Sequence, residues 1–564
     1  MGVIHPNSVG VFPSGFGEEG PLGGLRQLQT FQGLPGPPAA PAVQVIMVDR
    51  LRGDIDVTWT SLPGEEIASW ELRTSLTPIE TEADWDDATV VGTYPGAEGP
   101  PVVELRLLPF GETTYMAVRA TDSDGQTSEL GTASYRPFFE ETIFSTGLTT
   151  PAALVVAGDL SGDGRTDVVV GSAQSGVLIV TGLLDDGELV VTPLASPISG
   201  GQFGATIVAP GDVNGNGADD LLVFARTAPV DDATNAGIGF LYFGRTDGSL
   251  PESPDVEIIL GAQGAIIGES ATRGRGNLFD VGDEQLNDIV VGTRRSDGGR
   301  GYVFVIAGRE QWPSVIELSF DAHSNAQQGV LTIAGNDATQ GFGTRTAIVP
   351  TTTATDVDAS PSAHLVVTSL ATGSNSAGLL NLFTPERLDD LFRDALNSEG
   401  VVIDSAQATS SFSGEIASSD WGGTGSVVTA ARPLFDEEPS TLLVTDSANR
   451  IIDVLLVSRD GTVVRRATID PAISAGGTRI FPQAAAILSN PRNLADHSFF
   501  AGLLDFSAPG EYPYVFSFTE EGDSDMTSYV DTYTVNASAA VNCGTTGAFS
   551  LCLLDRNGNL VILR

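Results

Sequence analysis

An apolar run of three or four residues recurs seven times after residue 167, and this internal repeat constrains the fold more than any other feature. The copies begin at Val168, Leu221, Ile289, Leu365, Leu442, Phe499 and Leu551. A second apolar run follows each copy and a third precedes it, as in ALVVAGD and ATIVAPGD. Short strands repeated in this way, without amphipathic helices between them, are typical of β-propeller blades. We therefore predict that residues 138–564 form a seven-bladed β-propeller.

The ends of this repeat region predict how the ring closes. A closed ring buries the edge strands that separate sheets would expose. Because the chain ends four residues after Leu560, we expect the segment 141–148 (ETIFSTGL) to complete the last blade. One convincing helix is expected near 385–396, as an insertion in the fourth unit. The insertions 225–237 and 385–420 are the best candidates for partner contacts, judged by their length.

The residues before the repeats divide into two parts. Residues 1–40 are rich in Gly and Pro and have no hydrophobic periodicity, which predicts an extended leader or linker. Residues 41–137 contain short alternating strands separated by turn-rich links, which predicts a β-sandwich. The whole chain is therefore expected to be all-β.

The end of the sandwich segment resembles a fibronectin type III domain. The resemblance runs from Leu108-Pro109 through Tyr115, Val118 and Ala120 to Asp124-Gly125 and Ser128. It implies that the Tyr115 hydroxyl makes a corner hydrogen bond and that Trp59 fills the core. It also implies a spacer or binding module rather than a catalytic one.

Two turns before the first two apolar runs carry oxygen-bearing side chains at a regular spacing. They are Asp159-Leu-Ser161-Gly-Asp163-Gly-Arg165-Thr-Asp167 and Asp212-Val-Asn214-Gly-Asn216-Gly-Ala218-Asp-Asp220. Side-chain oxygens occupy positions one, three, five and nine, and glycine at position six permits a sharp turn. Ca²⁺ takes about six to eight oxygen ligands, and this spacing curls four side chains and the carbonyl of Arg165 or Ala218 around one point. The alternative is a pair of hairpin turns held by side-chain to backbone hydrogen bonds.

These turns resemble the calcium-binding loops of FG-GAP repeats, the units of the integrin-α-like β-propeller. Phe203-Gly204 and Phe342-Gly343 match the Phe-Gly start of that repeat. The resemblance implies two bound calcium ions. The third unit keeps Asp280, Glu284 and Asp288 but has Gly282 at position three, which leaves a weaker third site open. The fourth unit has His364 where the last carboxylate should be.

The two cysteines and four histidines limit the other chemistry. Cys543 and Cys552 lie on neighbouring predicted strands, and the sequence leaves open whether they form one disulfide or two buried thiols. The histidines are scattered without metal-ligand spacing, and no GxSxG nucleophile motif occurs. We expect that the protein is not an enzyme and has no catalytic residues.

The net charge of -44 restricts the partners. Nucleic acids and anionic membrane surfaces require cationic patches, so neither is an expected partner. No apolar run approaches the length of a membrane span, which excludes direct insertion. Every one of the 28 basic residues is Arg, and we interpret this acidic, lysine-free composition as that of a prokaryotic protein.

Three hypotheses about function follow. The first is an extracellular or cell-surface adhesion protein, whose calcium-stabilised propeller presents loops to a protein or glycan partner. The second is a structural subunit that self-associates or joins a larger surface assembly. The third hypothesis is a polysaccharide-active enzyme. It is the weakest, because carboxylate pairs are too abundant for any two to be singled out as catalytic residues. No signal peptide is visible in MGVIHPNSVG, so the export route stays open.

Overall fold

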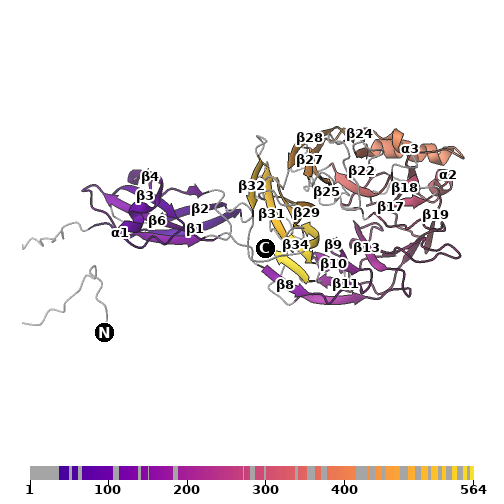
Figure 1. Cartoon of the computed structure of the whole chain (residues 1–564), viewed down its shortest axis with the longest axis horizontal. Helices are drawn as coiled ribbons and strands as arrows, with labels where there is room; N and C mark the ends of the chain where they lie inside the picture. The colour runs from indigo at the N-terminus through magenta and orange to yellow at the C-terminus, as the bar shows by residue number, and fades with distance from the viewer. Residues whose placement is uncertain are drawn as a thin grey trace, which may run out of the picture.

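The computed structural model forms many small β-sheets (Figure 1). It describes residues 37–49, 54–60, 66–105, 113–136, 141–149, 151–181, 189–270, 272, 274–279, 286–296, 300–336, 341–351, 362–369, 378–413, 428–431, 439–446, 451–469, 480–489, 497–505, 510–518, 524–528, 537–542, 551–555 and 559–563. The fold is all-β, as predicted. Of the helices in these ranges, none combines the length and the apolar character needed to cross a membrane. Residues 1–36, most of the predicted leader, lie outside the described residues.

The segment before the repeats folds into two antiparallel sheets. One has the order β1-β2-β5 and consists of β1 (Ala42–Asp49), β2 (Asp54–Thr60) and β5 (Val103–Leu105). The other has the order β4-β3-β6-β7 and consists of β3 (Ile67–Ser75), β4 (Thr89–Pro95), β6 (Thr114–Asp122) and β7 (Gly131–Tyr135), with α1 (Glu82–Asp87) and the 3₁₀ turn η1 (Gly96–Glu98) beside it.

Aromatic side chains from both sheets form the core of this segment. Trp59 on β2 and Trp70 on β3 are both fully buried and meet edge to face, with ring centroids 6.3 Å apart. Trp59 therefore fills the core as expected. Tyr115 packs near the buried Trp85 of α1. Its corner hydrogen bond stays a prediction, because residues 106–112 lie outside the described ranges.

The described residues from 141 onward form seven further sheets. The first is β9 (Pro151–Gly158), β10 (Asp167–Ser172), β11 (Gly176–Thr181) and β12 (Val190–Leu194); the second is β13 (Phe203–Gly211), β14 (Asp220–Ala225), β15 (Ile238–Tyr242), β16 (Val256–Leu260) and β19 (Val315–Leu318); the third is β17 (Ile289–Ser296), β18 (Arg300–Ile306) and β20 (Val330–Ala334). The fourth is β21 (Arg345–Pro350), β22 (Ala363–Ser369), β23 (Leu379–Phe383) and β24 (Ser410–Ser413); the fifth is β25 (Val428–Ala431), β26 (Ser440–Asp446), β27 (Ile451–Val457) and β28 (Val463–Ile469). The sixth is β29 (Ile480–Ser489), β30 (His497–Asp505), β31 (Gly510–Phe518) and β32 (Ser524–Ser528); the seventh is β33 (Ala537–Asn542), β34 (Leu551–Asp555), β35 (Asn559–Leu563) and β8 (Glu141–Ser145).

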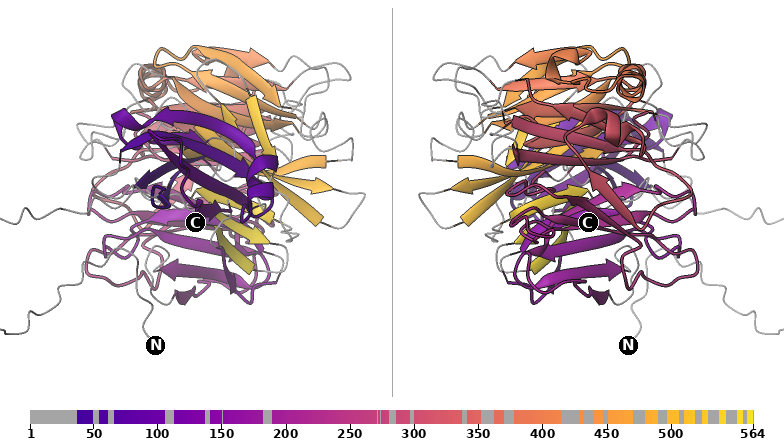
Figure 2. Two further views of the ribbon diagram at one scale, coloured as in Figure 1. Left: turned by 90° about the vertical axis from the view of Figure 1, so that its left-hand side faces the viewer. Right: turned by 90° about the vertical axis from the view of Figure 1, so that its right-hand side faces the viewer.

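The seventh sheet contains strands from both ends of the repeat region. β8 pairs antiparallel with β35, with Phe144 opposite Leu560, so the predicted pairing of this segment with the last unit is confirmed. The seventh sheet also lies against β9 of the first sheet, and the yellow and magenta strands are neighbours in both views of Figure 2. Leu154 and Val168 of the first sheet share a buried cluster with Leu560 and Ile562 of the seventh.

Cys552 lies in this same cluster, fully buried on β34. It is disulfide-bonded, so the hypothesis of buried free thiols is wrong for this residue. Cys543, the predicted partner, lies outside the described residues.

The second and third sheets are joined in a way that the repeat pattern does not predict. β19 follows β18 in the chain, yet it pairs in parallel with β16 at the outer edge of the second sheet. The chain then passes through a short helix, α2 (Ala322–Ala326), and returns as β20 beside β18. This crossing covers the edge of the second sheet, which would otherwise expose unpaired backbone groups.

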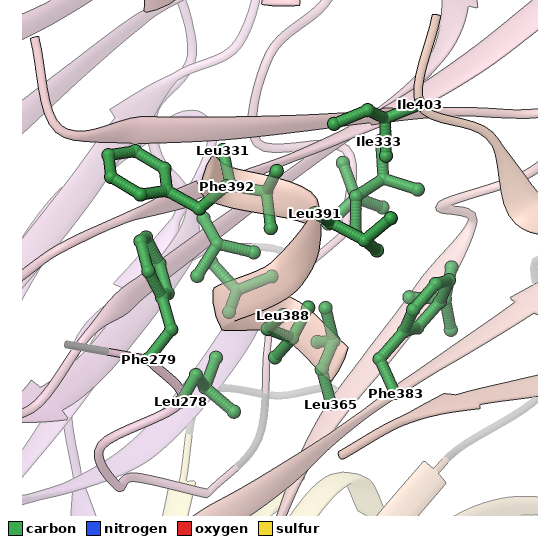
Figure 3. Packing of buried hydrophobic residues seen from close by; sticks show 14 of the residues in the cluster. Leu278, Phe279, Leu331, Ile333, Leu365, Phe383, Leu388, Leu391, Phe392 and Ile403 are labelled. Carbon is green, nitrogen blue, oxygen red and sulfur yellow. The ribbon is translucent and has the colours of Figure 1, made fainter. Parts of the chain in front are cut away.

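The insertion in the fourth unit contains the predicted helix, α3 (Pro385–Asn397). Thr384 caps its N-terminus and proline occupies the first turn, where no backbone N–H is needed. Its residues Leu388, Leu391 and Phe392 face a core that includes Phe279 and Leu365 (Figure 3). Phe392 therefore packs in the core, and this face of α3 is not free for a partner.

A left-handed glycine recurs near the start of the units where one sheet meets the preceding one. The φ angles of Gly204 and Gly343, from the two Phe-Gly pairs, are 89° and 82°. Gly268, with φ of 76°, occupies the same place in the third unit, preceded by Ile267 instead of Phe. A Cβ at Gly268 would lie only 2.3 Å from the ring of Phe224 in the second sheet.

Gly268→Ala should therefore lower the free energy of unfolding by about 2–4 kcal/mol, because alanine would be strained at this φ and would displace a buried ring. Urea denaturation measures the change. Gly264→Ala is the matched control, since Gly264 has φ of 70° and no atom within 4 Å of a built Cβ. The control should lose only about 1 kcal/mol. Equal losses in both variants would contradict the packing argument.

Candidate metal site

Loop 1 (residues 159–167) connects β9 to β10 in the first sheet. Two left-handed glycines, Gly162 with φ of 70° and Gly164 with φ of 82°, curl it into a compact turn. The carboxylate of Asp159 accepts hydrogen bonds from the backbone N–H groups of Asp163 (2.9 Å) and Gly164 (2.8 Å). The loop is therefore wrapped around the side chain at its first position, as the spacing predicts.

Asp167 closes loop 1 from the first position of β10 and is completely buried. Its Oδ2 accepts the backbone N–H groups of Leu160 (3.0 Å) and Ser161 (3.2 Å). Within the described residues, Asp167 Oδ1 and the buried Ser161 Oγ have no hydrogen-bond partner. Burial raises the pKa of Asp167 to about 7, and the negative charges of Asp163 and Asp159 add to this shift. Loop 1 thus holds two buried oxygens that a cation would satisfy.

The remaining predicted ligands of loop 1 lie at its surface. Asp163 and Arg165 are exposed, and Asp163 Oδ1 accepts the backbone N–H of Arg165 at 2.9 Å. No group of three His, Cys, Asp or Glu side chains within the described ranges is arranged to hold a metal ion. A cation in loop 1 would therefore need a mixed oxygen set, in which a carboxylate, a hydroxyl and backbone carbonyls all contribute.

Loop 2 (residues 212–220) connects β13 to β14 and repeats the same turn. The carboxylate of Asp212 accepts the backbone N–H groups of Asn214, Gly215 and Gly217 at 2.7–3.1 Å. The side-chain oxygens of Asn214 and Asn216 each accept a backbone N–H two residues further on. Ala218 is buried at position seven. This is the network that the hairpin alternative predicts.

Asp220 differs from Asp167 in having both oxygens occupied. Its Oδ2 accepts the N–H of Val213 at 2.8 Å, and its Oδ1 accepts the N–H of Gly244 at 2.9 Å. Burial raises the pKa of Asp220 to about 8, and the nearby Asp212 and Asp219 contribute in the same direction. Gly182 is the equivalent of Gly244 in the first unit and lies outside the described residues. Among the described residues, loop 2 is the more completely hydrogen-bonded of the two.

The third unit keeps the terminal carboxylate but not the predicted register. Asp288 Oδ2 accepts the N–H groups of Leu278 and Phe279, and its Oδ1 accepts the N–H of Gly308. By these bonds Leu278 corresponds to Leu160, so Asn277 occupies position one. The expectation that Asp280 begins this loop is therefore wrong. Asp280 and Glu284 lie outside the described residues.

The fourth unit replaces the carboxylate by His364, as the sequence predicts, and the structure supplies a reason. Strand pairing places Pro385 where the second and third units have Gly244 and Gly308. Proline has no N–H to donate, so a carboxylate here would lack that partner. Burial lowers the pKa of His364, and its Nε2 lies 3.1 Å from the carbonyl oxygen of Ser458, in the turn between β27 and β28.

Sequence patterns did not predict a glycine that recurs within two residues after the ends of β11, β15 and β18. Its signal is present at Gly182, Gly244 and Gly308. The backbone hydrogen bonds between consecutive loops are not marked by any pattern in the sequence. The N–H of Asp219 donates to the carbonyl of Asp159 at 3.0 Å, and the N–H of Asn287 donates to the carbonyl of Asp212 at 3.2 Å. Each loop is therefore built partly by the unit that follows it.

Comparison with known proteins identifies one segment. The chain as a whole matches no curated protein. The matched segment begins at the first residue of loop 1 and ends within β14, so it contains loop 1 and loop 2 in full. Residues 159–223 match the family model of the FG-GAP-like repeat, and the chain therefore carries an FG-GAP-like repeat across both loops.

Proposed function

We propose that residues 141–563 form a seven-bladed β-propeller of the FG-GAP kind and that residues 42–135 form a fibronectin type III-like sandwich. The propeller is supported by the seven successive sheets, by the pairing of β8 with β35 and by the contact of the seventh sheet with β9. The sandwich is supported by its two sheet orders and by the buried Trp59 between them.

We further propose that loop 1 binds Ca²⁺ and that loop 2 binds a second ion more weakly. The two buried oxygens of loop 1, Asp167 Oδ1 and Ser161 Oγ, support the first site. The complete hydrogen bonding of Asp220 is the reason to rank loop 2 second. When bound, the ion would neutralise the buried carboxylate and tie β9 to β10. Its role is structural.

The function that this arrangement supports best is non-catalytic binding or adhesion outside the cell. The observation that carries the proposal is the pair of buried oxygens within a matched FG-GAP-like repeat. External calcium is millimolar, which suits loops of modest affinity. The disulfide at Cys552 supports an oxidising compartment. The partner would be a protein or glycan of a surface, contacted through propeller loops.

A binding screen tests this function. The immobilised full chain is presented with purified surface glycans and surface proteins, in calcium and in chelator. We expect saturable binding to one class of partner that is lost in chelator and restored by calcium. Release of new reducing ends from a glycan would instead support an enzyme. Sedimentation as a large homogeneous particle without any partner would support a structural subunit.

The raised pKa values of Asp167 and Asp220 predict a pH dependence in the calcium-free protein. Both carboxyl groups bind protons more tightly in the folded state than an unburied aspartate does. The folded state therefore carries more protons than the unfolded state between about pH 4 and pH 8, so the free energy of unfolding should fall as the pH rises through this range. Thermal melts in chelator at a series of pH values measure the fall.

Two comparisons control this prediction. Asp167→Asn removes one titrating group and should flatten the fall, whereas Asp232→Asn removes an exposed carboxylate and should not. Calcium should also flatten it, because the ion compensates the buried charge. A rise in stability across this range in chelator would contradict the prediction.

A further inference from the structure

We propose that Asp219 and Arg275, which belong to the second and third units, act together as a clamp that positions the calcium loop of the first unit. Neither residue belongs to the ligand pattern of loop 1. The inference rests on the calcium site proposed above. It is argued from the contacts of Asp159, the first residue of loop 1.

Asp219 forms hydrogen bonds with both the backbone N–H and the backbone carbonyl of Asp159. Its own N–H donates to the carbonyl oxygen of Asp159 at 3.0 Å, and its Oδ2 accepts the N–H of Asp159 at 2.8 Å. The Asp159 carboxylate in turn accepts the N–H groups of Asp163 and Gly164. The orientation of the loop's first side chain is therefore fixed from the neighbouring sheet.

Gly158 makes this approach sterically feasible. It has φ of 73°, and a Cβ built there would lie 1.9 Å from Asp219 Oδ2 and 2.9 Å from Arg275 Nη1. Any larger residue would push the carboxylate and the guanidinium away from the loop. The side chains of Asp219 and Arg275 occupy the space that a Cβ at Gly158 would fill.

Arg275 holds the second oxygen of Asp219. Its Nη1 lies 2.7 Å from Asp219 Oδ1, and the Asp219 side chain is 18% exposed while that of Arg275 is 44% exposed. With both oxygens engaged, the Asp219 side chain has one favoured orientation. Loop 1 thus depends on a contact chain that spans three consecutive units.

Loop 2 provides an internal comparison, because its corresponding residue is neutral. Asn287 donates its N–H to the carbonyl oxygen of Asp212 at 3.2 Å, as Asp219 does for Asp159. Within the described residues, however, the buried Asn287 Oδ1 has no hydrogen-bond partner. The charged clamp is therefore a feature of loop 1 that loop 2 lacks. A loop held ready in its bound shape loses less conformational freedom when the ion binds.

Calorimetric titration of the chelator-stripped full chain with calcium tests the clamp. The site of interest is the one that disappears in Asp167→Asn. Asp219→Ala should weaken calcium binding at this site about tenfold, the factor expected for loss of a charge-assisted hydrogen bond. Asp219→Asn keeps an acceptor for Asp159 N–H and should recover part of the loss.

Arg275→Gln separates positioning from simple charge. Removal of a positive charge near a cation site should by itself strengthen binding, whereas release of Asp219 should weaken it. We expect weakening of about threefold, and no further effect of Arg275→Gln when Asp219 is already alanine. The exposed pair Asp390 and Arg393 on α3 supplies the controls Asp390→Ala and Arg393→Gln, which should leave the affinity within about twofold.

The outcomes distinguish the clamp from the calcium site itself. Wild-type affinity in Asp219→Ala, or tighter binding in Arg275→Gln, would overturn the clamp while the calcium site stands. Absence of calcium binding to the wild-type chain would overturn both. If Asp219→Ala fails to fold, Arg275→Gln decides alone, because the Arg275 side chain is largely at the surface.

Discussion

Replacing strand β8 (Glu141–Ser145) by a Gly-Ser segment of the same length is expected to lower the free energy of unfolding of the repeat region by about 3–5 kcal/mol. β8 is the outer strand of the seventh sheet and pairs with β35 along five residues. Phe144 also packs against the cluster shared by the first and seventh sheets. The replacement would remove this packing and leave the backbone of β35 unpaired at an edge.

Urea denaturation, monitored by far-ultraviolet circular dichroism, measures this loss in the free energy of unfolding. Hydrogen exchange in β35 should accelerate in the same variant, because β35 loses the strand that pairs with its outer edge. Ser145→Thr is the control, since Ser145 is exposed and threonine retains strand propensity and the ladder hydrogen bonds. Unchanged stability after replacement of β8 would mean that the strand does not close the repeat region.

Removal of calcium is expected to lower the melting temperature of the full chain by about 5–10 °C. An ion present at about one hundred times its dissociation constant adds about 2.7 kcal/mol to folding, and a large domain gains a few degrees for each kcal/mol. The physical reason lies in loop 1, where Asp167 and Ser161 hold buried oxygens without hydrogen-bond partners among the described residues. Thermal melts in millimolar calcium and in chelator measure the difference.

Asp167→Asn should lose most of this calcium-dependent gain, since it removes the buried charge that the ion neutralises. Asp232→Asn removes an exposed charge from the second unit and should retain the gain. Equal melting temperatures of the wild-type chain with and without calcium would remove the structural role that we propose for the ion.

The parts of the fold that follow from local patterns could be predicted from the sequence. The apolar runs at Val168, Leu221 and Ile289 each fall on a buried strand, because a strand covered on both faces needs continuous apolar residues. The pairing of β8 with the last unit was predicted from the apolar segment that precedes the first repeat. The helix α3 was predictable from its proline start and its apolar spacing.

Features that depend on neighbouring units could not be predicted in the same way. Asn277 takes the first position of the third loop because Asp288 holds Leu278 and Phe279, and the nearby Asp280 gave a misleading register. The crossing of β19 to the second sheet depends on pairing between segments far apart in the chain. No spacing rule encodes such non-local contacts, which form only in the assembled fold.

The candidate site shows the same division. The ligand spacing of loop 1 was evident from the sequence, but the difference between Asp167 and Asp220 arises from their surroundings. Asp220 receives an N–H from Gly244, whereas Asp167 Oδ1 receives none from the described residues. The sequence pattern assigns no role to Asp219, and only the fold places it against Asp159. The spacing of residue types therefore predicts that a loop is a candidate metal site, but it does not predict which of two such loops is the stronger candidate.

Direct measurement of calcium binding tests the central claim that loop 1 of this FG-GAP-like repeat is a calcium site. The chelator-stripped full chain is titrated with calcium by calorimetry, beside the Asp167→Asn and Asp232→Asn variants. The account predicts saturable binding to the wild-type chain, loss of one equivalent in Asp167→Asn and no loss in Asp232→Asn. A wild-type chain that binds no calcium, or an Asp167→Asn variant that binds as many ions as the wild type, would contradict it.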